Sequence, residues 1–442
     1  MISVSNNLGL VFFPAFDWAI SPTHPEREER LLYTRDQIVE EGLFDLPNIH
    51  ELRPSIAEDK AIERVHIPGT EIGGLITDAH RISAGGAIAA AEAVLEKKVA
   101  RAFALVRPPG HHAMRVVHGI RGFCTINNEA IMIEHLRQKY GVRRVAVVDT
   151  DVHHGDGTQD IFYHDPDVLF ISFHQDGRTL YPGSGFVSEA GGPNAYGTTI
   201  NIPLPPGTGD EGLHYLLDNL VKPVLADFAP EIVINSAGQD NHYSDPLANM
   251  RITAQGYASL AEKLQADIAV LEGGYSIEQA LPYVNAGIIL AMAGLDYRFV
   301  KEPDYQLLRQ RADITAFIEE QTAVLWRLWR NRTRLRQEQL AHWGDVYEQS
   351  RSIYYDESGI VEQQSERVRL CPACSGYMTI DSQAVDSRRR RTRIFAAIIP
   401  RFSCPACADE ARERYRYAAG QGQYHFVYLQ DKPGDAFWRH PC

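Results

Sequence analysis

The stretch Val145-Ala-Val-Val-Asp149-Thr-Asp151-Val-His153-His-Gly-Asp156 joins an apolar, β-branched run directly to a cluster of acidic and imidazole side chains. A short apolar run of this kind is typical of a strand buried inside a sheet. Polar residues that follow such a strand lie at its carboxyl end, which is where open α/β sheets bind their ligands. The stretch therefore predicts one strand of a parallel sheet with a functional site at its end.

The same alternation of apolar runs and helix-like stretches continues over the first 300 residues. Further strand-like runs lie at residues 8–13, 102–106, 168–172, 199–202, 231–235 and 268–272. Helix-like stretches lie between several of them, at residues 84–97, 128–140, 212–227 and 253–266. Strands that alternate with helices predict an α/β fold: a three-layer, open, mostly parallel sheet with helices on both faces.

The composition is that of a folded globular protein with an excess of acidic residues. The chain has 442 residues, of which 44% are apolar and 23% charged, and its formal net charge is −13. This charge argues against broad binding of nucleic acid or membrane surfaces and leaves small, neutral or cationic substrates open. The start of the chain lacks the basic segment of a secretory signal, and its longest uncharged run, residues 279–295, is too short to span a membrane. We therefore expect a cytoplasmic protein.

A metal centre is predicted by three residues that follow two of the strands. Asp151 and His153 stand two positions apart, so their side chains point to the same side and can bind one ion. Asp240 follows another strand and would supply a third ligand at the shared edge. Three protein ligands with a fourth position left open are typical of catalytic rather than structural zinc. Taken alone, the Asp-x-His pair would more often be a capping aspartate and a loop histidine.

Acid–base chemistry is indicated by residues that reach the same edge. His111 and His112 follow a Pro-Pro-Gly bend, and Asp149 and Asp156 could each orient one imidazole and raise its basicity. Tyr275 follows two glycines and could donate a hydrogen bond to an oxyanion. A loop-stabilising histidine pair and a tyrosine packed at a strand end are the structural alternatives, and they are commoner for isolated motifs.

In combination, these motifs resemble the zinc-dependent histone deacetylase family, which includes bacterial deacetylase-like amidohydrolases and acetylpolyamine amidohydrolases. The resemblance covers residues 1–297, and its motifs occur in matching order. They are His24-Pro-Glu-Arg27, Arg107-Pro-Pro-Gly-His-His112, Gly122-Phe-Cys124 with Asn127-Asn128, Asp149–Gly157, Tyr181-Pro-Gly-Ser-Gly185, Gly238-Gln-Asp240 with Asp245-Pro-Leu247, and Glu272-Gly-Gly-Tyr275. The resemblance implies the arginase–deacetylase fold and deacetylase activity.

The resemblance also implies a role for each residue that matches. Three residues would bind Zn²⁺: Asp151, His153 and Asp240. His112 would act as the general base and acid, while His111 would position water and balance charge. Asp149 would pair with His111, and Asp156 with His112. Tyr275 would polarise the acyl carbonyl and stabilise the tetrahedral intermediate.

A tunnel for the acyl-lysine stem is implied in the same way. Phe123 and Tyr181 would line it, Tyr181 at a position that usually holds phenylalanine, and Gly122 would leave room for the stem. Relatives that select polyamines carry an acidic gatekeeper where Leu247 stands, so leucine favours a lysine carried by a peptide. Five residues match the family's site for a monovalent cation such as K⁺: Asp149, Asp151, His153, Ser172 and Phe173.

The last third of the chain changes character. From residue 304 to about 347 the sequence is typical of one long charged helix. Its apolar residues share a seven-residue register at Leu307, Ile314, Leu328 and Leu335. Such a stripe either packs against the catalytic domain or pairs two chains in a coiled coil, and Gln321 on the stripe suits both. A homo-oligomer formed through this helical extension is therefore one of the two alternatives.

Two Cys-Pro-Ala-Cys knuckles follow, with the thiols of Cys371, Cys374, Cys404 and Cys407. Two such turns complete a closed tetrahedral site, which predicts structural zinc, whereas a redox motif would not need duplication. A segment of about 50 residues around the site carries little apolar content, so we expect the metal to stabilise it. Arg388–Arg391 and Arg393 lie between the knuckles. They fit a solvated hairpin tip better than a contact with nucleic acid or an acidic protein.

We divide the chain into a deacetylase-like catalytic domain (1–297), a helical extension (298–366) and a zinc-ribbon-like domain with four cysteine ligands (367–442). The favoured function is a zinc-dependent amidohydrolase that removes acetyl or short acyl groups from protein lysines. One alternative is a deacetylase of acetylated polyamines or other small amides. Another is a recruitment module that acts through its zinc ribbon.

Overall fold

The computed structural model describes residues 7–16, 18–69, 74–305 and 308–441. Its catalytic domain is built on an eight-stranded sheet in which every pairing of neighbours is parallel. In spatial order the strands are β2 (Ile49–Leu52), β1 (Leu8–Phe13), β4 (Arg101–Val106), β10 (Ile268–Leu271), β9 (Ile232–Ala237), β6 (Val145–Asp149), β7 (Val168–Gln175) and β8 (Thr199–Leu204). The predicted open parallel sheet is confirmed.

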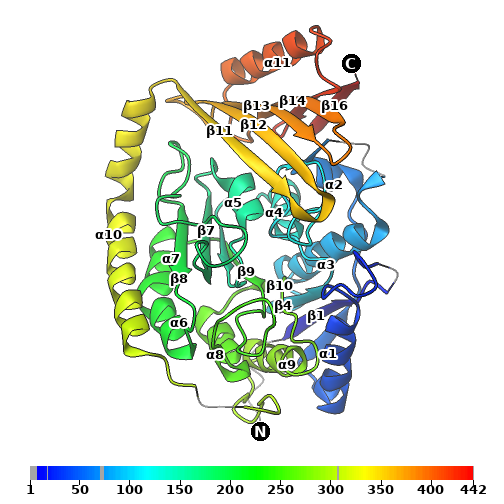
Figure 1. Cartoon of the computed structure of the whole chain (residues 1–442), viewed down its shortest axis with the longest axis vertical. Helices are drawn as coiled ribbons and strands as arrows, with labels where there is room; N and C mark the ends of the chain where they lie inside the picture. The colour runs from blue at the N-terminus through cyan, green and yellow to red at the C-terminus, as the bar shows by residue number, and fades with distance from the viewer. Residues whose placement is uncertain (1–6, 17, 70–73, 306–307, 442) are drawn as a thin grey trace.

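Helices cover both faces of this sheet (Figure 1). One layer comprises α2 (Asp59–Glu63), α3 (Asp78–Leu95), α4 (Asn128–Tyr140) and α5 (Asp156–Phe162). The other comprises α1 (Glu29–Glu40), α6 (Asp210–Leu216), the π-helical turn η3 (Leu217–Val221), α7 (Lys222–Phe228), α8 (Ala254–Leu264) and α9 (Leu281–Met292). Alternate side chains of β6 enter the two cores, Val145 and Val147 on one side and Ala146 and Val148 on the other. The three-layer prediction is therefore confirmed.

Long helix α10 (Ala312–Trp343) runs along one side of the molecule (Figure 1). Ile314, Ile318 and Leu325 are buried against the catalytic domain. Gln321 donates a hydrogen bond from Nε2 to the carbonyl of Pro203 at 3.0 Å. Of the two alternatives for this stripe, packing within the chain is the one observed. Leu307, which belongs to the predicted register, lies outside the described residues.

The C-terminal domain is a six-stranded mixed sheet with one helix. In spatial order its strands are β11 (Val346–Tyr355), β12 (Ile360–Arg369), β13 (Tyr377–Val385), β14 (Arg391–Ile399), β15 (Phe426–Asp431) and β16 (Ala436–Pro441). All pairings are antiparallel except β14–β15, which is parallel and is connected through α11 (Pro405–Ala419). The arginine run lies at the turn of the β13–β14 hairpin, as predicted.

Two predictions about this region are wrong. The boundary between 366 and 367 cuts the sheet, because β11 and β12 belong to it and the helix ends at Trp343. The low apolar content predicted around the cysteines is also wrong, because Val368, Ile380 and Ile398 lie in an apolar core of the C-terminal sheet. Strand β12 escaped prediction because Glu362 and two other residues that it buries are polar, so the apolar alternation that marks a strand is absent. Strand β11 escaped because it buries only two residues, Ile353 and Tyr355, both near its end.

The C-terminal domain packs directly on the catalytic domain. Ile67 and Val116, from the small parallel pair β3 (Ile67–Pro68) and β5 (Val116–Val117), join the core of the C-terminal sheet. Tyr428 donates a hydrogen bond from its hydroxyl to the carbonyl of Pro68 at 2.6 Å. Among the described residues, no helix combines the length and apolarity needed to cross a membrane.

Candidate active site

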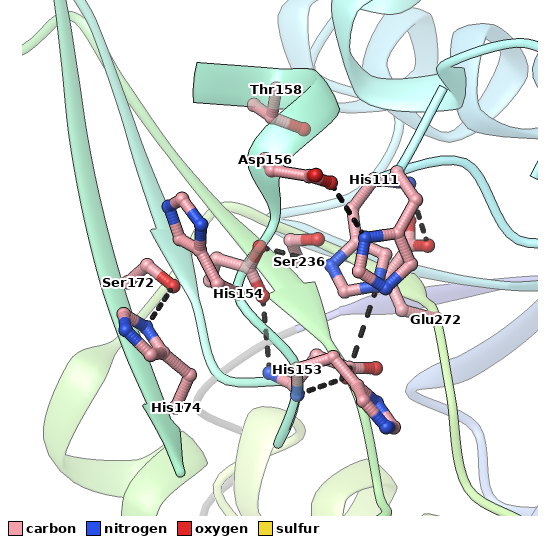
Figure 2. Close-up of polar contacts among 12 residues, drawn as sticks. His111, His153, His154, Asp156, Thr158, Ser172, His174, Ser236 and Glu272 are labelled. Atoms are coloured by element: carbon pink, nitrogen blue, oxygen red, sulfur yellow. Dashed lines mark hydrogen bonds and ion pairs between the residues drawn. The ribbon is translucent and has the colours of Figure 1, made fainter. Parts of the chain in front are cut away.

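The predicted site residues meet at the carboxyl edge of the parallel sheet. His111 follows β4, Asp149 ends β6, Asp240 follows β9 and Tyr275 follows β10. Figure 2 shows His111, His153 and Asp156 gathered there from adjoining loops. Because these strands are neighbours in a parallel sheet, their loops share one edge, and residues up to 164 positions apart form one site.

Three donors of a metal centre lie together as predicted. The ligand atoms of Asp151, His153 and Asp240 all lie within 4.8 Å of one another. His153 Nδ1 is 3.0 Å from Asp151 Oδ1 and 3.2 Å from Asp240 Oδ2. Asp240 Oδ2 is buried and accepts no hydrogen bond from the described part of the chain. A buried carboxylate oxygen without a partner is costly, and a cation would satisfy it, so these residues fit a zinc ion.

The remaining carboxylate oxygens of this centre are fixed by the backbone. Asp240 Oδ1 accepts a hydrogen bond from the amide of Val152 at 2.8 Å, and Asp151 Oδ2 accepts one from Gly273 at 2.8 Å. A Cβ atom at Gly273 would lie 2.1 Å from Asp240 Oδ2, which is far inside van der Waals contact. Only glycine allows the backbone to approach the carboxylates so closely.

The two adjacent histidines form the pairs that were predicted. His111 Nδ1 lies 3.1 Å from Asp149 Oδ2, and His112 Nδ1 lies 2.8 Å from Asp156 Oδ1. Burial opposes a charge on His111, but the carboxylates of Asp151 and Asp149 raise the pKa of His111 to about 9. For His112, burial and the nearby charge of His111 hold the pKa well below its usual value. The pair therefore separates into a charged His111 and a neutral His112 that can accept a proton.

Two further groups hold these histidines in place, and no role was predicted for either from the sequence. Glu272 accepts backbone hydrogen bonds at Oε2 from Gly110 at 2.7 Å and from His111 at 3.0 Å. Arg121 contacts the second oxygen of Asp156 through Nη2. Glu272 belongs to the motif Glu272-Gly-Gly-Tyr275, and Arg121 directly precedes the motif Gly122-Phe-Cys124. Their places in or beside these motifs are the only signal in the sequence that they belong to the site.

Tyr275 is held at the wall of the site by its backbone and its ring. Its amide donates a hydrogen bond to Asp245 Oδ2 at 2.7 Å. The guanidinium carbon of Arg30 lies 4.9 Å from the ring centroid, and Arg30 Nε donates to the carbonyl of Gly274 at 2.8 Å. Burial raises the pKa of Tyr275 well above its usual value, so the phenol stays protonated and can donate a hydrogen bond.

A cavity of about 240 Å³ opens onto this chemistry. Among the residues that line it are all four predicted substrate-binding residues: Gly122, Phe123, Tyr181 and Leu247. Phe123 adopts a φ of +70°, unusual for a residue with a side chain, and its ring meets that of Tyr275 edge to face with centroids 5.5 Å apart. One residue from the C-terminal domain, Asp356, lines the same cavity, and no motif in the sequence pointed to it.

The residues of the predicted monovalent cation site lie on two adjacent strands, β6 and β7, and in the loop that follows β6. Asp149 of β6 and Ser172 of β7 are direct partners in the sheet register. Ser172 Oγ is 2.9 Å from His174 Nδ1, and Figure 2 shows this pair joined by a dashed line. Asp149 Oδ1 accepts a hydrogen bond from the amide of Asp151 at 3.1 Å, and the side chain of Phe173 lies in the core. A bound K⁺ stays a prediction.

A second set of metal donors lies in the C-terminal domain. The sulfur atoms of Cys371, Cys374, Cys404 and Cys407 all lie within 4.8 Å of one another. Cys371 and Cys374 follow β12, while Cys404 and Cys407 lie at the start of α11. The amide of Gly376 donates to Cys374 Sγ at 3.2 Å. The predicted grouping of the two knuckles is therefore confirmed, and four thiolates suit tetrahedral zinc.

Known proteins share the catalytic part of this architecture. Residues 70–291 match the histone deacetylase domain. A probable deacetylase of Archaeoglobus fulgidus is 47% identical over 314 residues, which cover 65% of this chain and 86% of that protein. An acetylpolyamine amidohydrolase of Burkholderia pseudomallei is 41% identical over 201 residues, which cover 44% of this chain and 57% of that protein.

The fold has a counterpart among solved structures. The crystal structure of the HDA15 HD domain superposes with a TM-score of 0.64 at 26% identity, covering 76% of this chain and 98% of that one. Several other relatives are matched over only 43% to 57% of their own length. The match to the histone deacetylase domain, at residues 70–291, lies within the catalytic domain.

Proposed function

Because the chain belongs to the histone deacetylase family of zinc-dependent amidohydrolases, we propose that it removes acetyl and other short acyl groups from lysine side chains. The observation that carries this proposal is the shared cavity. His112, His153 and Tyr275 line one space of about 240 Å³, so an acyl group that enters it meets the acid–base residue, a metal ligand and a phenol together.

The reaction that we propose gives each of these groups a role. Zinc bound by Asp151, His153 and Asp240 would polarise the amide carbonyl and make a water molecule more acidic. His112 is neutral and takes the proton of the attacking water at Nε2, while Asp156 holds its other nitrogen. Tyr275 donates a hydrogen bond to the oxyanion as it develops. His112 then passes its proton to the leaving amine, which yields acetate and a free amine.

The shape of the cavity supports a lysine stem as the group that it binds. Phe123, Leu180 and Leu247 give it apolar walls, which suit a methylene chain. Leu247 supplies no charge to attract the second ammonium of a polyamine. The 41% identity to an acetylpolyamine amidohydrolase favours acetylated small amines as the second candidate substrates.

A substrate panel tests the proposal. The full-length protein would be assayed for acetate release from acetyl-lysine peptides and from acetylated diamines and polyamines. We expect turnover of at least one acetyl-lysine peptide at a higher kcat/KM than acetylspermidine. Faster turnover of acetylspermidine than of every peptide would assign the small amines instead, and no release from any acylated amine would refute the proposed function.

A further inference from the structure

The loop of the β11–β12 hairpin belongs to the C-terminal domain (Figure 1), yet its residue Asp356 lines the catalytic cavity. The loop is a short helical turn, Asp356–Ser358, closed by Gly359 at a φ of +61°. The figure shows the two strands extending from the upper sheet down over the catalytic domain. Through this loop, a domain that otherwise lies apart from the chemistry contributes to the cavity wall.

The hairpin is held against the catalytic domain by hydrogen bonds on both sides of its loop. Tyr355, which is buried, donates from its hydroxyl to the carbonyl of Val116 at 2.7 Å. Ser358 Oγ accepts the amide proton of Ile120 at 2.8 Å. These contacts fix the loop along the segment that leads into the tunnel residues Gly122 and Phe123.

Asp356 itself joins two walls of the tunnel. Its Oδ1 accepts the amide proton of Gly122 at 3.0 Å and the hydroxyl proton of Tyr181 at 3.2 Å. Both bonds end on the same carboxylate oxygen, and the side chain is half-buried. The carboxylate is therefore held in one position before any substrate arrives, which lowers the entropic cost of binding to it.

The charge of Asp356 stands out in its surroundings. Of the described residues that line the cavity, Asp356 is the one carboxylate; the others are apolar residues, glycine, two tyrosines and histidines. The guanidinium of Arg121 contacts Asp156 and also interacts electrostatically with Asp356, but Arg121 is not among the residues that line the cavity. The carboxylate of the next residue, Glu357, lies with its Oε1 atom 3.7 Å from His24 Nε2. The cavity wall thus presents a negative charge, fixed beside Gly122 and Tyr181, to a group that the substrate carries next to its acylated amine.

We infer that Asp356 is a specificity-determining residue, which binds a positively charged group carried by the substrate beside its acylated amine. This inference rests on the proposed function, since it names a feature of the substrate of that site. The carboxylate of Asp356 would attract an ammonium or guanidinium group of the substrate, whereas Leu247 supplies no charge that could do so. A basic residue next to an acyl-lysine and the free ammonium of an acetylated diamine are the two sources of such a charge.

Matched substrate pairs and one near-isosteric variant test this inference in the full-length protein. The peptide pair carries arginine or its neutral isostere citrulline next to acetyl-lysine. The small-amine pair is a monoacetylated diamine and the N-alkylacetamide of equal length. Asp356→Asn keeps an oxygen that accepts both hydrogen bonds but removes the charge. For each pair we expect the variant to lower the ratio of charged to neutral kcat/KM about three- to tenfold, through KM rather than kcat.

Glu357→Gln is the control, because it removes the same charge from the neighbouring residue, which does not line the cavity. We expect it to change the ratio less than twofold. A ratio that Asp356→Asn leaves unchanged, or that falls equally in Glu357→Gln, would overturn the inference. A fall confined to one pair supports the inference and identifies the source of the charge. Failure to hydrolyse any acylated amine would instead refute the proposed function.

Discussion

At the scale of single residues, the histidine pair shows how surroundings give two identical side chains different roles. Asp149 and Asp151 both lie near His111 and favour its charged form. Asp156, which holds His112, is also contacted by the guanidinium of Arg121. The arginine balances the charge of Asp156, so this carboxylate can fix the tautomer of His112 without forcing a proton onto it.

Replacing Tyr275 by phenylalanine removes one hydrogen-bond donor and leaves the ring in place. Because the phenol acts on charge that develops in the transition state, we expect kcat to fall about 10²- to 10³-fold with little change in KM. Steady-state assays of acetate release, with zinc content measured alongside, check this. An unchanged kcat would remove Tyr275 from the mechanism.

The sequence predicted those site residues that lie in motifs after strands. His112 and Tyr275 were predicted because a strand end and a recognisable motif mark each of them. The carboxylates that pair with the two histidines, Asp149 and Asp156, were predicted because they flank the metal ligands. Asp356 could not be predicted in this way. It lies 81 positions after Tyr275, and it reaches the cavity through a hairpin that nothing in its sequence distinguishes.

At the scale of elements, helix α10 acts as a brace for the catalytic domain. Trp329 is 1% exposed and donates from Nε1 to Asp227 Oδ2 at 2.9 Å. We expect Trp329→Ala to lower the free energy of unfolding by about 3 kcal/mol, since it removes a large buried side chain and its hydrogen bond. Urea denaturation checks this against Trp326→Ala, a partly buried tryptophan of the same helix, which should cost less. Equal losses in the two variants would argue against the brace.

The four-cysteine site is an element of its own, and we propose that it binds one structural zinc ion in addition to the catalytic one. Cys404→Ser should lower the zinc content by about one ion per chain. Hydrogen exchange should increase in residues 371–376 and in the first turn of α11, while the central strands stay protected by their apolar core. An unchanged zinc content would refute the assignment.

Strands and helices could be predicted from the sequence where they bury apolar side chains, but not where they bury polar ones. Strand β6 and helix α4 have the predicted bounds, because apolar spacing marks both of them. Strand β12 buries Glu362, Gln364 and Glu366 instead. Gln364 donates a hydrogen bond to Glu362 within the strand, and their further partners come from other elements. Glu366, for example, lies 2.7 Å from His164 Nε2 of the catalytic domain. Such partners are set by tertiary structure, so no local pattern reveals the strand.

At the scale of the whole molecule, a buried ion cluster joins the two domains. Glu134 of α4 lies 3.2 Å from Lys432 Nζ and 3.7 Å from an Arg401 nitrogen, both in the C-terminal domain. Burial would raise the pKa of Glu134, but Lys432, Arg137 and Arg401 lower it to about 2. Removing the carboxylate would leave these cations buried and poorly matched.

The cluster predicts how stability depends on pH. Because the pKa of Glu134 lies below its ordinary value of 4.5 in the folded protein, its contribution is complete above pH 4.5 and is lost as the pH falls towards 2. We expect Glu134→Gln to cost about 3 kcal/mol at pH 7 and to flatten the acid dependence of the free energy of unfolding. Urea titrations at several pH values measure both, and a variant as stable as the parent at pH 7 would contradict the prediction.

The central claim is that the centre formed by Asp151, His153 and Asp240 hydrolyses an acylated amine with the help of zinc. Its most direct test is the release of acetate from an acetyl-lysine peptide by chelator-treated full-length protein as zinc is returned. We predict negligible release after chelation and recovery with added zinc, but no recovery in Asp240→Ala. Acetate release at the untreated rate, from protein shown by metal analysis to have lost its zinc, would contradict the claim.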